Sequence, residues 1–138
     1  MPQRDRYHGI VHDALVADGW SITHDPYTLG AGSTNVYVDL GAERVIAAER
    51  GSERIAVEVK SFLGRSSAAD IEQALGQYLL YRGLLARQEP ERTLFLAVPH
   101  EAWEGVWSSA LGRVALDDYR VKVLVFNIEE GSIERWHS

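Results

Sequence analysis

The feature that most constrains the fold is an alternating strand that leads into a long helix and then into an apolar strand. Residues 55–62 read IAVEVKSF, and β-branched residues at every second position have the period typical of a strand. A helical pattern begins near Ser67, with Asp70 completing a capping pair, and runs to about Arg87. An apolar strand follows over residues 92–98. A strand joined through a helix to a parallel strand predicts an α/β fold: a mixed β-sheet flanked by helices on both faces.

The remaining pattern supplies the other elements of this sheet. We expect helices over residues 3–18, 100–107 and 111–118. Strands are expected over residues 20–24, 36–40, 121–128 and 132–136, with a loop over 30–35. Residues 43–50 and 54–61 form a hairpin across the Gly51–Ser52 turn. We find no repeat, linker or low-complexity segment, so residues 1–138 are interpreted as a single domain.

Composition excludes several classes of protein. The chain contains no cysteine, which removes disulfides, thiolate metal sites and cysteine nucleophiles. No apolar run approaches the length of a membrane span, and the first residues lack an apolar signal region. We therefore expect a cytoplasmic protein with no membrane association. The net charge of −6 argues against holding DNA by bulk electrostatics, although a local basic patch or a bound divalent cation overrides that average.

Two charges interrupt the apolar strand at residues 55–62. Glu58 and Lys60 are separated by two positions and therefore lie side by side on one face of the strand. One interpretation is a solvated ion pair on an exposed face, and the other is a metal-binding glutamate beside a catalytic lysine. Helices over both faces of the sheet favour the second, because a buried charge is costly unless it is paired or bound to a metal.

A second carboxylate is available on the strand before the hairpin. If the sheet brings the two strands together, Asp39 and Glu58 can hold one Mg²⁺ or Mn²⁺ ion, with the carbonyl of Val59 as a further ligand. Lys60 would orient or help to deprotonate the attacking water and offset phosphate charge. Gln73 and Gln77 repeat every four residues on the long helix with Tyr81, and the two amides are candidates for positioning a phosphate or a ligand water.

These residues resemble the PD-(D/E)XK nuclease superfamily, through Asp39 followed by Glu58-Val59-Lys60. The spacing is long, and Val38 stands where that pattern has proline. Nearly the whole chain also resembles the XisH family, the fdxN element excision controlling factors of cyanobacteria. The resemblance is carried by the segments DRYH, DGWSITHDP, YVDLGAERVIAAERG, IAVEVKSFLGRS and EQALGQYLLYR.

The resemblance implies a restriction-endonuclease-like fold and a role in DNA recombination. It implies control of the site-specific excision of a DNA element, alongside a recombinase and a small XisI-type partner. One expectation is a Mg²⁺-dependent endodeoxyribonuclease. A homodimer is also expected, because nuclease-fold proteins that cut both DNA strands often dimerise. Glu43 is a second candidate acid beside Asp39.

A non-catalytic regulatory or assembly protein is the alternative, and so is one half of a toxin–antitoxin-like or defence pair. Trp103 and Trp107, four residues apart on a short helix, are either a partner anchor or part of the core. His8 and His12 have the spacing of a metal-binding pair on a helix, or form a surface pair beside acidic residues.

Overall fold

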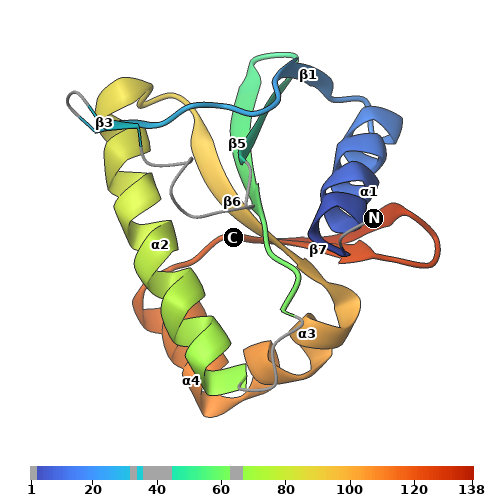
Figure 1. The fold of residues 1–138 in the computed structure, drawn as a ribbon, viewed down its shortest axis with the longest axis vertical. Coiled ribbons are helices and arrows are strands. Elements are labelled where there is room, and N and C mark those ends of the chain that lie inside the picture. Colours follow the sequence, from blue (N-terminus) through green and yellow to red (C-terminus); the bar gives the residue numbers. More distant parts are fainter. Residues whose placement is uncertain (1–2, 32–33, 36–44, 63–66) are drawn as a thin grey trace.

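The computed structural model describes residues 3–31, 34–35, 45–62 and 67–138, and arranges them as a central sheet between helices (Figure 1). The long helices are α1 (Gln3–Ala17) and α2 (Ser67–Gln88). The strands of the central sheet are β1 (Ser21–His24), β4 (Val45–Arg50), β5 (Glu53–Val59), β6 (Thr93–Pro99), β7 (Val123–Asn127) and β8 (Ser132–His137). None of the helices among these residues has the length and apolar character needed to cross a membrane.

The six strands form a mixed sheet in the order β1-β4-β5-β6-β7-β8. Its centre is parallel, because β5 pairs with β6 and β6 pairs with β7 in the same direction. Both edges are antiparallel: β1 and β4 extend from β5 on one side, and β8 extends from β7 on the other. Helix α2 connects β5 to the parallel strand β6, which confirms the α/β fold expected from the strand–helix–strand pattern.

The sheet buries a different core on each face. On one face α2 and the helical segments after β6 cover Ala47, Ala56, Leu96 and Val125. On the other face α1 covers Ile46, Val57, Ala97 and Phe126. Figure 1 shows α1, in blue, and α2, in yellow-green, on opposite sides of the strands. Helices on both faces, as the sequence predicts, leave no wide solvent face for a charged side chain on β5.

Helix α2 owes its position to a regular apolar stripe. The residues of this stripe recur at intervals of three or four and are all buried: Ile71, Ala74, Tyr78, Tyr81 and Leu85. Tyr81, which the sequence places in a polar row with Gln73 and Gln77, therefore belongs to the core, whereas the side chain of Gln73 is exposed. The row divides because successive positions at intervals of four drift around the helix by about 40° each.

The segment between β6 and β7 differs most from the two helices expected there. It consists of α3 (His100–Glu104), the 3-10 turn η2 (Val106–Ser108), α4 (Ala110–Arg113) and a π-helical turn, η3 (Val114–Asp118). The first helix ends at Gly105, whose backbone is not helical. A Cβ atom at Gly112 would lie 2.2 Å from the carbonyl oxygen of Trp107, so only glycine allows α4 to pack this closely on η2. Trp107 is 1% exposed and part of the core.

Residues 30–35 are not wholly irregular. Two short strands, β2 (Gly30–Ala31) and β3 (Thr34–Asn35), pair antiparallel where the sequence predicts a loop. The strand expected over residues 36–40, which contains Asp39, lies outside the described residues, and so does Glu43.

Candidate functional site

Glu58 lies at the carboxyl end of β5, on the face covered by α2. It pairs with Val45 of β4 and with Leu96 of β6, both of which belong to the core of that face. Its side chain is 0% exposed. An ionised carboxylate at such a position requires compensating partners, because desolvation of an unpaired charge costs several kcal/mol.

Lys60 provides a charge of opposite sign at the same end of β5. Its side chain is 8% exposed, and its Nζ lies 3.8 Å from Oε2 of Glu58. Its backbone N–H donates a 3.0 Å hydrogen bond to the carbonyl of Ala97, which continues the pairing of β5 with β6 by one residue. The ladder therefore fixes the direction of the Lys60 side chain. Two residues that the sequence places on one face are in contact at the end of the parallel strands.

Helix α2 contributes the third member of this cluster. The Nζ of Lys60 donates a hydrogen bond to Oε1 of Gln77, on the third turn of α2. Gln73 lies one turn nearer the start of α2 and its side chain is exposed. The structure thus brings together Glu58, Lys60 and Gln77, and places Gln73 at the adjoining surface. We call the first three residues the Glu58 cluster.

Tyr78 adjoins the Glu58 cluster, although no pattern in the sequence selects it as a site residue. Its hydroxyl donates to the carbonyl of Leu94 at 2.9 Å and accepts from the N–H of Lys122 at 3.1 Å. Burial raises the pKa of the Tyr78 hydroxyl, and the negative charge of Glu58 acts in the same direction. Hydrophobic periodicity does not distinguish such a residue, because a buried tyrosine on a helix recurs at the same spacing as a leucine.

The expected metal site is described only in part. Glu58 offers oxygen ligands, and Val59 occupies the next position of β5, but Asp39 lies outside the described residues. Among the described residues, no three His, Cys, Asp or Glu side chains are close enough to share a metal ion. His8 and His12 are held by different carboxylates: the first contacts Asp25 at 2.7 Å and the second Asp13 at 3.1 Å.

A second buried charge cluster lies at the opposite end of the parallel strands, around Arg92. Its guanidinium is hydrogen-bonded to both carboxylate oxygens of Glu89, at 2.9 Å each, and to the carbonyl of Ile55 at 2.9 Å. Tyr27 donates to Glu89 at 2.6 Å. These hydrogen bonds from Arg92 and Tyr27 lower the pKa of Glu89 to about 2. We call Tyr27, Glu89 and Arg92 the Arg92 cluster.

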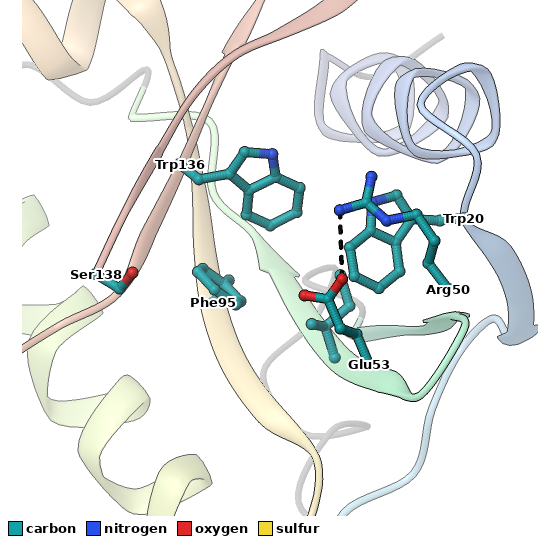
Figure 2. A pocket seen from close by; sticks show the side chains of 7 residues that line it. Trp20, Arg50, Glu53, Phe95, Trp136 and Ser138 are labelled. Atoms are coloured by element: carbon teal, nitrogen blue, oxygen red, sulfur yellow. Dashed lines mark ion pairs between the residues drawn. The ribbon is translucent and has the colours of Figure 1, made fainter.

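A concavity of about 200 Å³ opens on the α1 side of the sheet, and Figure 2 shows the side chains around it. Trp20, Phe95 and Trp136 form its aromatic wall; the rings of Phe95 and Trp136 are 4.9 Å apart. Arg50 lies 4.4 Å from the centre of the Trp20 ring and is paired with Glu53 at 3.5 Å. The Nε1 of Trp20 is buried and has no hydrogen-bond acceptor among the described residues. We call this concavity the aromatic pocket.

Comparison with known proteins places the whole described fold in one group. The family model of the XisH protein matches residues 1–134. The chain is 42% identical to an XisH family protein from Nostoc punctiforme PCC 73102, with a TM-score of 0.87 over 97% of this chain and 100% of that one. It is 41% identical to an fdxN element excision controlling factor protein from Anabaena variabilis, with a TM-score of 0.87 over 97% and 99% of the two chains. No curated protein matches the chain.

Proposed function

Because the chain belongs to the XisH family, we propose that it is an excision controlling factor that acts on DNA through a Mg²⁺-dependent, nuclease-type site. The proposal extends to this chain the role named for the relative from Anabaena variabilis. It also adopts the resemblance of Asp39 and Glu58-Val59-Lys60 to the PD-(D/E)XK pattern. The reaction class is hydrolysis of a phosphodiester bond.

The observation that carries the proposal is the burial of Glu58 and Lys60 in contact at the end of β5. Structural ion pairs usually lie at the surface, where each contributes little to stability, and a hydrophobic pair would fill the same space at lower cost. A pair kept in the core at this position is therefore better explained by chemistry than by stability. The end of a parallel strand beside a crossover helix is also where α/β sheets commonly bind ligands.

The donor set fits a hard divalent cation. Glu58 and Asp39 would supply carboxylate oxygens and Val59 a carbonyl oxygen, the ligands that Mg²⁺ and Mn²⁺ prefer. Glu43 is a second candidate acid, and it precedes Val45, the pairing partner of Glu58, by two residues in the sequence. When bound, the ion would lower the pKa of a coordinated water and stabilise charge on the phosphate.

The protein side chains would perform the remaining steps. Lys60 positions the attacking water and offsets the charge that develops on the phosphate. Gln77 accepts a hydrogen bond from the Lys60 Nζ and so fixes the direction in which the ammonium points. Gln73, exposed one turn away on α2, would donate its amide N–H to a phosphate oxygen.

The test is a cleavage assay on supercoiled and linear duplex DNA with Mg²⁺ or Mn²⁺. The double variant Glu58→Gln/Lys60→Met replaces the buried ion pair by neutral side chains of similar size, which commonly preserves a fold. We expect it to lose cleavage by about 10²-fold or more. The control Glu72→Gln changes one exposed acid on α2 and should cleave at the wild-type rate. Equal activity in all three proteins would refute a nuclease site at Glu58.

The aromatic pocket favours a second function, that of a non-catalytic assembly protein. Open aromatic concavities are typical sites for an anchoring side chain of a partner. The partner at this pocket would be an XisI-type protein, a site-specific recombinase or a second copy of this chain. Trp136→Ala would weaken co-purification with such a partner and leave DNA cleavage unchanged. If the variant is captured as well as wild type, the aromatic pocket is not the docking site.

A further inference from the structure

A concavity of about 210 Å³ lies between the second half of α2, the start of β6 and the residues that lead into β7. Its polar lining consists of Tyr78, Arg82, Arg92, Thr93, Arg120 and Lys122, and the rest is aliphatic. Four of these side chains are cationic and none is acidic. We call this concavity the basic pocket. Such a concentration of positive charge is unexpected in a chain whose net charge is −6.

Among the described residues, three of the four cations have no carboxylate partner. Arg92 is paired with Glu89 and Glu49 and belongs to the Arg92 cluster. In the described part of the chain, no carboxylate lies within ion-pair distance of Arg82, Arg120 or Lys122. Arg82 and Arg120 are exposed, and Lys122 is half-buried. Three like charges gathered in one concavity repel each other unless an anion lies between them.

The backbone holds these cations in place. Arg82 donates from Nη1 to the carbonyl of Tyr119 at 2.9 Å, which fastens the turn that carries Arg120. Arg120 itself has a φ of 56°, a left-handed conformation that favours glycine. The N–H of Lys122 donates to the hydroxyl of Tyr78 at 3.1 Å. An arginine in this conformation strains the backbone, and strained residues cluster at functional sites. We therefore infer a function for the charge of Arg120.

We propose that the basic pocket binds a phosphate of the nucleic-acid backbone, so that Arg82, Arg120 and Lys122 hold DNA away from the reacting bond. This inference rests on the proposed function, because it takes DNA as the ligand. Guanidinium groups match phosphate oxygens in a bidentate geometry, and lysine adds a point charge.

The basic pocket is separate from the Glu58 cluster. It adjoins Thr93 and Leu94 at the start of β6, whereas Lys60 is hydrogen-bonded to Ala97, three to four residues further along that strand. At about 3.3 Å per residue, the two sites are roughly 10–13 Å apart along the strand. The phosphate in the basic pocket is therefore not the one that Glu58 and Lys60 would attack, and it serves to position the DNA.

The experiment measures binding of a fluorescent 20-base-pair duplex in EDTA, so that no metal contributes and binding is separated from cleavage. Arg120→Gly removes the charge and relieves the left-handed backbone, so the variant should melt at or above the wild-type temperature. Lys122→Gln removes a charge while its backbone hydrogen bond to Tyr78 is retained. The control Arg113→Gln removes an exposed positive charge of α4 that does not line the pocket.

We expect Arg120→Gly and Lys122→Gln each to weaken duplex binding by roughly three- to tenfold. The slope of log affinity against log salt should decrease by about 1 for each variant. The Arg113→Gln control should bind within about twofold of wild type. If the two pocket variants bind the duplex as tightly as Arg113→Gln, with unchanged salt slopes, the proposal is wrong, whether or not the protein cleaves DNA.

A second experiment distinguishes free phosphate from nucleic-acid phosphate as the ligand. It also tests the basic pocket independently of the nuclease site. Inorganic phosphate is titrated into wild type and Arg120→Gly; binding that depends on Arg120 without any duplex binding would overturn the assignment to nucleic acid. Duplex binding that depends on Arg120 and Lys122, in a protein that never cleaves with Mn²⁺, would support the basic pocket and contradict the nuclease site. Because duplex binding and cleavage are measured separately, each proposal can fail without the other.

Discussion

The two buried charge clusters lie at opposite ends of the parallel strands and are built differently. In the Arg92 cluster the guanidinium makes five hydrogen bonds within the described chain, two of them to backbone carbonyls. In the Glu58 cluster the two charges are 3.8 Å apart, and the ammonium is held by a helical amide. The first is the bonding pattern of a structural joint, since it ties the chain between α2 and β6 to β4 and β5. The second matches a site built to meet a further ligand.

We expect the Arg92 cluster to contribute more to the free energy of unfolding than the Glu58 cluster does. Arg92→Met would leave Glu89 without its main partner and would remove the side-chain donor to the carbonyls of Ala48 and Ile55. We expect the free energy of unfolding to fall by about 3–5 kcal/mol. Urea denaturation measures this loss, with Arg87→Met on the exposed part of α2 as the matched control. A loss below about 1 kcal/mol would show that the Arg92 cluster is not a structural joint.

The Glu58 cluster is tested by a double-mutant cycle. Lys60→Met alone leaves the buried charge of Glu58 without its lysine and should cost about 2–4 kcal/mol. The double variant Glu58→Gln/Lys60→Met should cost less than the single one, because no buried charge is left to solvate. Urea denaturation of the four proteins gives the coupling energy. Strictly additive losses would indicate that Glu58 and Lys60 do not interact in the folded state.

Acid should weaken the Arg92 cluster. Hydrogen bonds from Arg92 and Tyr27 lower the pKa of Glu89 from 4.5 to about 2, so the ionised form is favoured in the folded state. The resulting stability is fully present above about pH 5 and is lost as the pH falls towards 2. We expect about 1–3 kcal/mol, reduced by solvent screening at this partly exposed carboxylate. Stability measured from pH 6 to pH 3 should fall less steeply in Arg92→Met than in wild type.

The smallest effect is expected from the helical amide. Gln77→Ala removes one hydrogen bond to Lys60 and should cost about 0.5–1.5 kcal/mol in thermal or urea unfolding. The same variant should lower the rate of cleavage by a larger factor than its loss of stability explains, since the Lys60 ammonium would no longer be fixed in direction. The neighbouring Gln73→Ala, at an exposed position, should leave stability unchanged and is the control for the unfolding measurement only.

Most of the fold was predictable because local periodicity reports which elements form and which faces they bury. The alternation in β5, the Gly51–Ser52 turn and the apolar stripe of α2 each specify an element and its orientation. The prediction was wrong where packing overrides local pattern. The helix expected over residues 100–107 is interrupted at Gly105. Of the two interpretations of the tryptophan pair, Trp107 follows the second, because it is buried in the core.

The candidate site was predictable in part, for the same reason. Glu58 and Lys60 share a face of one strand, so their contact follows from a period of two. Gln77 was selected from its polar row, and its contact with Lys60 agrees with that choice. Tyr78 and the cations of the basic pocket were not selected, because they are brought together from α2, β6 and the chain before β7 by the crossover.

The sequence by itself determined the element order, the helices on both faces and the family, because these depend on local pattern and on long matching segments. The tertiary structure alone decided which charged side chains meet partners on distant elements. Lys60 finds Gln77, and Arg92 finds Glu49 and the carbonyl of Ile55, across 17 to 43 residues of chain. Periodicity indicates the face on which a side chain lies, but the residue opposite it is set by strand order and helix placement. Those are properties of the folded chain as a whole.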